Sequence, residues 1–227
     1  MRAGCVRVNG SVRRDPESPV HLEKDRIEVD GRPVKAGKRV YLMMNKPRGV
    51  ITSASDEKRR DTVYSYLGDD VPWVGPVGRL DKASEGMLLL TNDSEWAGKI
   101  TAPDTHLDKT YQVQIATVAD EEVLSSMVHG VATRNGTLRV KRAAILRAGE
   151  KNSWLEIVLD EGRNRQIRRI LEGLEVEVLR LVRVAIGSLS LGELKKGGVR
   201  PLSPDEKRAL DEAMMQSGRV VQSRVRG

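Results

Sequence analysis

The sequence contains no phenylalanine, and aromatic residues make up only 3% of its 227 residues. This scarcity argues against extensive stacking of nucleic-acid bases on aromatic side chains. Cys5 is the single cysteine, which excludes an internal disulfide and favours a reducing cytoplasm. The three histidines, His21, His106 and His129, are scattered without metal-ligand spacing, so no zinc site is expected.

Long apolar segments are also missing. No apolar run approaches the roughly 20 residues that a membrane-spanning helix requires, and residues 1–12 contain no signal-peptide core. Positive charge, in contrast, is in excess: 39 Lys and Arg against 32 Asp and Glu give a formal net charge of +7. This surplus indicates a polyanionic partner and, without a membrane segment, favours a nucleic acid.

One stretch of the chain combines a turn, a polar loop and a buried strand. The turn is rich in glycine and proline, and Arg79–Gly86 after it is too charged to be buried without partners. Met87–Leu90 is a continuous apolar run that polar residues end, which predicts a strand buried on both faces. A lone Asp81 on this loop would most simply bond its own backbone. Its place between rigid elements and its nearness to Arg79 favour a catalytic role instead.

A second stretch, Gly162–Leu171, places four arginines within seven residues. On a helix, Arg165, Arg168 and Arg169 share one face while apolar residues share another. A solvated charged face is the simplest explanation. Clustered like charges repel unless an anion lies among them, however, and a helix N-terminus adds positive potential there. Phosphate contact is therefore the preferred interpretation.

Both stretches resemble motifs of the RsuA-type pseudouridine synthases. Gly78–Asp93 is similar to the active-site motif of that family, Gly-Arg-Leu-Asp followed by Ser, Gly, a leucine-rich run and Thr-Asn-Asp. Gly162–Arg169 is similar to its Gly-Arg-Asn-Arg-Gln-Ile-Arg-Arg motif, and Asn45–Gly49 to its Asn-Lys-Pro-x-Gly motif. The resemblance covers about residues 39–210. The two strongest motifs lie far apart in the sequence, which chance agreement does not explain.

The resemblance implies roles for individual residues. It makes Asp81 the catalytic carboxylate, Tyr111 the side chain that packs on the target uracil, and Arg168 the cation that pairs with Asp81 and keeps it ionised. By pattern alone, Tyr111 is equally a core residue of an alternating strand at Lys109–Ile115. The Asn-Lys-Pro motif buttresses the catalytic loop in the family. The residues expected to bind substrate or RNA are Lys46, Arg79, Lys109, Arg163, Asn164, Arg165, Gln166 and Arg169.

Strands outnumber helices and several are adjacent, so an α+β fold with a mixed, mainly antiparallel central sheet is expected. The resemblance implies the same: a pseudouridine synthase catalytic domain at 39–215 with its active site in a cleft between two halves of the sheet. Ser53–Arg60 is expected to be a polar surface loop. A last helix is expected to end near Met215, with a disordered basic tail at 216–227.

Residues 1–38 are expected to form a small separate part. An alternating hairpin at Cys5–Val12 and a strand at Asp25–Gly31 look like the back half of the family's αL RNA-binding module, followed by a linker at Pro33–Lys38. A basic helix pair forms the front half of that module and is missing from this sequence. Either the start has been placed too late or the module is reduced.

The resemblance therefore implies a monomeric cytoplasmic enzyme that isomerises a uridine of ribosomal RNA, with large-subunit RNA preferred over small-subunit RNA and with no membrane partner. Isomerisation involves no net redox or group transfer, so no cofactor is expected. Whether Asp81 attacks the ribose or removes a ribose proton stays open. One alternative is a non-catalytic RNA-binding or ribosome-assembly protein. Another is a nucleoside or glycoside hydrolase that pairs Asp81 with Glu85.

Overall fold

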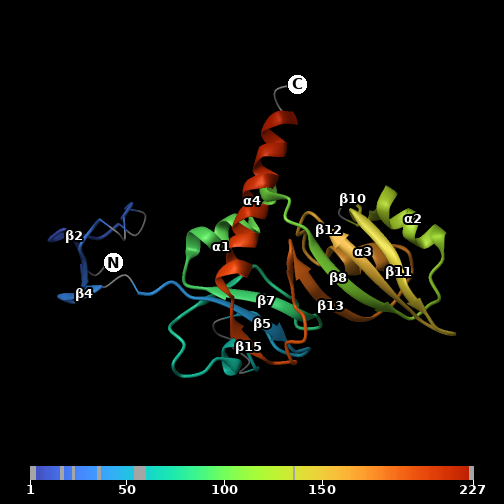
Figure 1. Ribbon diagram of the computed structural model, residues 1–227, viewed down its shortest axis with the longest axis horizontal. Coiled ribbons are helices and arrows are strands. Elements are labelled where there is room, and N and C mark those ends of the chain that lie inside the picture. The colour runs from blue at the N-terminus through green and yellow to red at the C-terminus, as the bar shows by residue number, and fades with distance from the viewer. Residues whose placement is uncertain are drawn as a thin grey trace. The chain divides into compact units, whose positions relative to one another are not determined.

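The computed structural model describes residues 4–15, 18–21, 24–34, 37–53, 60–134 and 136–224, the last nine of these as backbone only. The chain divides into two compact units, Met1–Arg39 and Val40–Gly227 (Figure 1). Most of the expected polar loop, residues 54–59, lies outside the described residues.

The first unit is a four-stranded antiparallel sheet with the strand order β2-β1-β3-β4. Its strands are β1 Val6–Val8, β2 Ser11–Arg13, β3 Ile27–Val29 and β4 Arg32–Val34. The expected hairpin is confirmed, and Asn9 and Gly10 form its turn with positive φ angles. Strand β4 replaces part of the expected linker, because proline is tolerated on an edge strand. That this unit corresponds to half of an αL module stays a prediction.

The second unit is built on a nine-stranded sheet with the main order β11-β12-β8-β13-β7-β5-β15. Every described neighbour pair in this sheet is antiparallel except β13 and β7, which confirms the predicted mixed, mainly antiparallel sheet. Its strands are β5 Tyr41–Lys46, β6 Gly75–Val77, β7 Glu85–Thr91, β8 Lys109–Ile115, β11 Arg142–Ala148, β12 Ser153–Leu159, β13 Val178–Ile186, β14 Leu189–Ser190 and β15 Val199–Pro201. A separate hairpin consists of β9 Val131–Thr133 and β10 Gly136–Leu138.

The helices are α1 Ser94–Thr101, α2 Glu121–His129, α3 Gln166–Gly173 and α4 Pro204–Arg224, with short 3-10 helices η1 Val63–Tyr66 and η2 Pro103–Thr105. The last helix continues to Arg224, so its expected end near Met215 is wrong. The expected disorder of the tail at 216–227 stays a prediction. Gly218 is the one strong helix breaker there, and a single glycine costs a helix only about 1 kcal/mol. Residues 225–227 lie outside the described residues. No described helix is long and apolar enough to cross a membrane.

Three hydrophobic cores fix the layers around the sheet. Core 1 packs α2 and α3 on β8, β12 and β13, whereas core 2 packs α1 and α4 on β5 and β7. Core 3 covers the other face of β5 and β7 with the loop segments between Val50 and Leu80. The alternation within β7 divides its side chains: Met87 and Leu89 enter core 2, while Leu88 and Leu90 enter core 3. Because Tyr111 packs against both core 1 and core 3, those two cores meet on one face of the sheet.

Candidate active site

One buried lysine holds the loop that carries Asp81 by hydrogen bonds to its backbone. Lys46 is fully buried at the end of β5, and its Nζ donates to the backbone oxygens of Pro47, Asp81 and Ser84 at 3.0, 3.2 and 2.9 Å. The amide of Gly49 also donates to the carbonyl of Lys82, at 2.7 Å. The backbone around Asp81 is therefore held at several points, which confines its side chain before any substrate binds.

This burial contradicts the expected RNA contact of Lys46, because its ammonium is bound to three backbone carbonyls inside the protein. Burial lowers the pKa of Lys46 from its ordinary value of 10.5 to about 8, although Asp81 and Glu85 favour its charged form. The ammonium therefore loses its charge within the pH range in which enzymes are assayed. Neutral lysine retains only two N–H donors for the three carbonyl oxygens it serves.

If the Asp81 loop carries out the chemistry, turnover is expected to fall as the pH rises through about 8, because the neutral Lys46 amine holds that loop less firmly. The free energy of unfolding should change in the opposite direction. Because the pKa in the folded chain lies below 10.5, the unfolded chain binds more protons between about pH 8 and 10.5, and the contribution of Lys46 to stability rises across that range. Rate and urea-denaturation profiles over pH 6.5–10 would test both, with Lys46→Met as the variant that should lack the kinetic step.

The Asp81 carboxylate is half-buried and receives no hydrogen bond or ion pair from the described residues. Arg168 approaches the same loop from α3, where its Nη2 donates to the carbonyl of Ala83 at 3.0 Å. Its Nε is buried without a partner among the described residues. The expected direct ion pair between Asp81 and Arg168 is therefore not formed, because the guanidinium is directed at the loop backbone. The two charges still interact through space.

Arg168 belongs to a cluster of three guanidinium groups. Burial lowers its pKa most, and the charges of Arg165 and Arg48 lower it further, while Asp81 raises it. Arg48 and Arg165 are both exposed, and Arg48 Nη1 donates to the carbonyl of Leu179 at 3.3 Å. None of the three guanidinium groups has a carboxylate partner among the described residues. Arg48 was missed in the sequence, although it directly follows the Asn-Lys-Pro motif.

An open depression of about 380 Å³ adjoins this cluster at the start of β13. It is lined by Arg165, Arg168, Glu172, Glu175, Val176, Glu177 and Val178. Arg165 has a positive φ of 49° directly before α3, so the chain turns sharply there and leaves this side chain exposed. Three glutamates share the depression with the two arginines, but none forms an ion pair with either arginine among the described residues. Arg165 therefore presents an unpaired cation to solvent next to Arg168, which contacts the Asp81 loop.

Tyr111 lies half-buried on β8, at the junction of core 1 and core 3. Its cross-strand partner is Arg183 on β13, which in turn pairs with Gly86 at the start of β7. The Asp81 loop leads into β7 at Gly86. Through the pairing of Gly86 with Arg183 and of Arg183 with Tyr111, Tyr111 lies two strands from the loop, on the sheet face that carries cores 1 and 3. The tyrosine is thus both a core residue and a neighbour of the site.

Other residues expected to contact RNA occupy different places. Gln166 is buried, and its side-chain amide donates to the Arg139 carbonyl at 2.9 Å and to Glu161 at 2.7 Å, so this expectation is wrong. The Nη2 of Arg169 donates to the hydroxyl of Thr133 on β9 at 2.9 Å, whereas Arg168 donates to the carbonyl of Ala83. Some polar side chains of α3 therefore fix the helix to the rest of the protein. The helical periodicity of the sequence does not distinguish such side chains from those that bind RNA.

The remaining expected contacts are at least partly accessible. Arg79 and Asn164 are exposed, and Arg163 is exposed with an ion pair to Glu161 at 3.0 Å. Lys109 is half-buried, and burial followed by the charge of Arg183 lowers its pKa.

Glu85 is excluded as a second catalytic carboxylate. It is only 3% exposed, and it forms ion pairs with Arg180 and Lys196 at 3.1 and 2.6 Å. Burial raises the pKa of this carboxyl, but the two cations outweigh burial and lower it overall. The hydrolase alternative requires a pair of carboxylates with access to substrate. Of Asp81 and Glu85, only Asp81 is accessible to substrate and free of an ion pair with the described residues.

The fold and the site thus define an enzyme with one half-buried carboxylate, a neighbouring tyrosine and a cluster of unneutralised arginines, which suits chemistry on a nucleotide of a nucleic acid. Comparison with known proteins agrees. Residues 40–173 match the family model of the RNA pseudouridylate synthases. The chain belongs to this family, and the predicted enzyme class, an isomerase that makes pseudouridine in RNA, is confirmed.

Relatives and solved structures extend this match to most of the chain. The chain is 36% identical to ribosomal large subunit pseudouridine synthase B of Bacillus subtilis, over 92% of this chain and 86% of that protein. It is 37% identical to an uncharacterized RNA pseudouridine synthase of Aquifex aeolicus, over 93% and 85% of the two chains. A crystal structure of a pseudouridylate synthase is similar with a TM-score of 0.69 and 30% identity, covering 92% of this chain and 90% of that one.

Proposed function

We propose that this enzyme converts one specific uridine of large-subunit ribosomal RNA to pseudouridine, with Asp81 as its catalytic residue. The half-buried Asp81 on a loop anchored by Lys46 is the observation that carries the proposal. The similarity to the large-subunit enzyme of Bacillus subtilis supports the choice of RNA. A ribosomal substrate would place the enzyme in the cytoplasm, where ribosomes are assembled.

The reaction breaks the bond between ribose C1′ and uracil N1, turns the uracil, and forms a bond between C1′ and C5. The proton on C5 is lost and N1 gains one, so atoms and electrons balance without an oxidant, reductant or group donor. One ionised carboxylate suffices, whether it bonds to the sugar or removes a ribose proton. The half-buried position of Asp81 strengthens its electrostatic interaction with the developing charge.

The arginine cluster has two tasks in this proposal. The target nucleotide must leave its stack to reach Asp81, which costs a few kcal/mol. Arg48 and Arg165 are exposed and would bind the phosphates on either side of the extruded nucleotide. Arg168 is half-buried and would instead stabilise the charged form of Asp81 and the carbonyl of Ala83. Tyr111 would pack against the freed uracil and keep it in the site.

Arg168→Met tests the second task. Turnover is expected to fall about 100-fold, because the loop loses a hydrogen bond and Asp81 loses the favourable interaction with the Arg168 charge. The dissociation constant for RNA should change only a few-fold, because the side chain is partly buried. Single-turnover rates and equilibrium binding would be measured separately. Arg208→Met, which removes an exposed arginine of α4 that has its own carboxylate partner, is the matched control. Equal losses in both variants would remove Arg168 from the mechanism.

The target is best found on ribosomal RNA itself. Carbodiimide labelling with primer extension would be applied to RNA from cells with the gene, without it, and with the gene encoding Asp81→Asn. The expected result is one large-subunit stop that is lost without the gene and is not restored by the variant. A stop in small-subunit RNA would correct the choice of RNA. An unchanged pattern of stops in both RNAs would overturn the proposed function.

A further inference from the structure

The part of the sheet formed by β8, β11, β12 and β13 has a second face that the proposed chemistry does not use. One face of these strands carries core 1, with Val113, Leu155 and Ile157 fully buried. The alternate side chains lie on the opposite face and are partly accessible. We call this the outer face and define it by Gln112, Gln114, Arg147, Trp154, Glu156 and Arg180. Because Tyr111 belongs to the core 1 face, the outer face is on the reverse side of the sheet from Tyr111.

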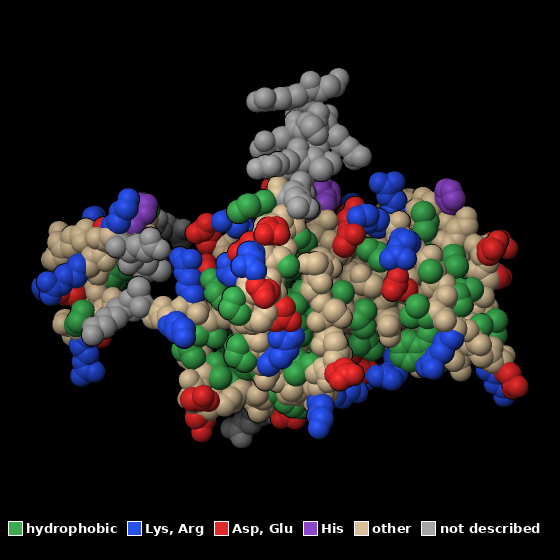
Figure 2. Space-filling view, in the orientation of Figure 1, with side chains coloured by type: hydrophobic (Ala, Val, Ile, Leu, Met, Phe, Trp, Pro, Cys, Tyr) green, Lys and Arg blue, Asp and Glu red, His purple; other side chains and the backbone are tan. Residues whose placement is uncertain are grey.

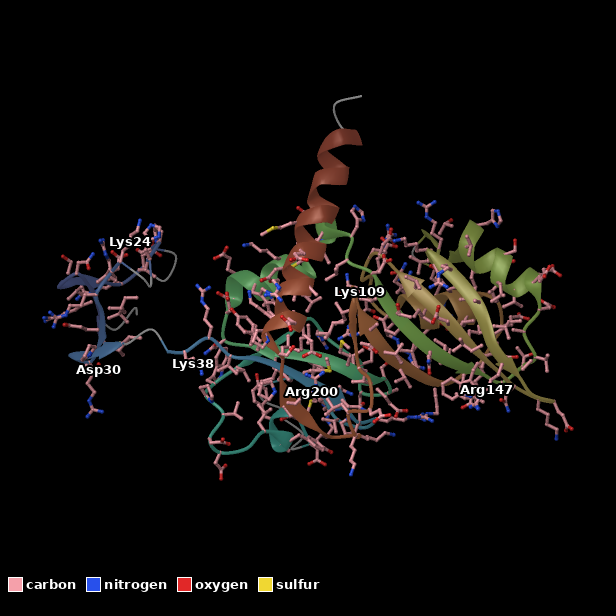
Figure 3. The ribbon with its side chains drawn as sticks, in the orientation of Figure 1. Lys24, Asp30, Lys38, Lys109, Arg147 and Arg200 are labelled. Carbon is pink, nitrogen blue, oxygen red and sulfur yellow. The ribbon has the colours of Figure 1, made fainter. Side chains whose placement is uncertain are left out.

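A row of four residues crosses the outer face. The strand register pairs Arg147 with Trp154, Trp154 with Gln114, and Gln114 with Arg180. The guanidinium carbons of Arg147 and Arg180 lie 5.3 and 5.5 Å from the centre of the Trp154 ring, within the range of a cation–π interaction. Figure 3 labels Arg147 on this part of the sheet. The indole thus holds two arginines in fixed positions on an accessible surface.

The charges of this face do not cancel. Glu156 is paired with Arg142 at 2.9 Å, and the buried Glu85 is paired with both Arg180 and Lys196. Arg147 is exposed and has no carboxylate partner among the described residues. The outer face itself carries two cations and one carboxylate, and with the ion-pair partners Arg142, Lys196 and Glu85 the count is four cations and two carboxylates. Figure 2 shows Lys and Arg side chains distributed over much of the surface of the second unit.

A guanidinium held against an indole retains N–H donors that can form two hydrogen bonds to one phosphate. Its side chain is already ordered, so binding loses less conformational entropy. The amides of Gln112 and Gln114 beside it offer donors and acceptors to ribose or base edges. These groups match a nucleic-acid backbone better than an apolar protein surface.

We propose that the outer face, at its Arg147–Trp154 end on β11 and β12, binds the phosphate backbone of RNA that flanks the target nucleotide. The inference rests on the proposed function only in taking RNA as the substrate. Arg147 lies on β11, the edge strand of the sheet, three strands away from β13 in the strand order. A short hairpin that fills only the active site would not reach the outer face, whereas a longer transcript would.

The test compares Arg147→Gln with Lys99→Gln, which removes an exposed lysine of α1. Binding is measured for a short uridine-containing hairpin and for a transcript of the surrounding large-subunit RNA, at several salt concentrations. For the transcript, Arg147→Gln is expected to raise Kd about fivefold and to reduce the slope of log Kd against log salt by about 0.7–0.9. Neither the binding of the hairpin nor its single-turnover rate should change. Lys99→Gln should behave as the parent enzyme with both RNAs.

Trp154→Leu keeps every charge and removes the platform on which the arginines are ordered, so it should also weaken transcript binding, with the salt slope retained. Thermal melting verifies that each variant folds. Transcript affinity that is the same in Arg147→Gln and Lys99→Gln would overturn the outer-face proposal. Binding is scored independently of pseudouridine formation, so a protein that binds the transcript through Arg147 but modifies no uridine would overturn the proposed function and leave this inference standing.

Discussion

Asp81→Asn is expected to reduce pseudouridine formation by about 1,000-fold or more while leaving the fold and RNA affinity intact. Asparagine has nearly the shape of aspartate but cannot attack the ribose or take up a ribose proton at neutral pH. The carboxylate receives no hydrogen bond from the described residues, so the loop loses no contact when it is replaced. The anchors of the loop are made by its backbone oxygens and are kept.

The reaction replaces the hydrogen on uracil C5, so tritium placed there is released into water with each turnover. Rates would be measured on a transcript labelled in this way, with binding measured in parallel. Asp69→Asn, an exposed aspartate in the loop before β6, is the matched control and should retain full activity. If Asp81→Asn kept more than about a tenth of the parent rate, Asp81 would not be the catalytic carboxylate. Loss of binding as well as rate would point to a role in holding RNA.

The sequence predicted the parts of this site that depend on local patterning. The apolar run Met87–Leu90 indicated a fully buried strand, and all four of its residues have no exposed surface. The alternation in Lys109–Ile115 gave β8 with its correct bounds. Two motifs that lie far apart in the sequence, Gly78–Asp93 and Gly162–Arg169, meet where Arg168 contacts Ala83. That contact follows from the sheet order and not from either motif alone.

What the sequence could not predict depends on where long polar side chains end. A lysine before a proline and a glycine suggests an exposed turn, whereas Lys46 is completely buried because three backbone oxygens converge on its ammonium. Gln166 has the same ambiguity within an arginine-rich segment: its amide satisfies a backbone carbonyl and Glu161. The position of a backbone carbonyl acceptor cannot be read from the pattern of side chains in the sequence. Expected RNA contacts on such residues are therefore the least dependable part of a motif.

Gly86→Ala is expected to have the largest effect on stability. Gly86 ends the catalytic loop with a φ of +101°, a conformation that residues with a Cβ rarely adopt. A Cβ there would lie 2.3 Å from the carbonyl oxygen and 2.8 Å from the nitrogen of Arg183. Both atoms belong to the backbone of β13, so no side-chain rotation can relieve the contact.

The strand pairing transmits the effect of this clash to the positions of Asp81 and Tyr111. Strands β7 and β13 are the one parallel pair described in the sheet, and they pair only through Glu85 with Val182 and Gly86 with Arg183. Arg183 also pairs with Tyr111 on β8. Moving β13 away from β7 would therefore separate Asp81 from Tyr111 and strain the ion pairs that the buried Glu85 forms with Arg180 and Lys196. The two parts of the sheet that flank the site depend on this contact for their relative position.

The expected loss in the free energy of unfolding for Gly86→Ala is about 3 kcal/mol or more. For a domain of this size, that loss lowers Tm by about 6–12 °C. Turnover should fall even at temperatures where the variant remains folded. Gly98→Ala is the control, because nothing lies within 4 Å of its Cβ position in α1 and alanine favours a helix by about 1 kcal/mol. The free energies of unfolding of the two variants would be measured by urea denaturation and compared. If they differed by less than about 1 kcal/mol, β7 and β13 would have room to separate, and the close approach at Gly86 would not be what holds the site together.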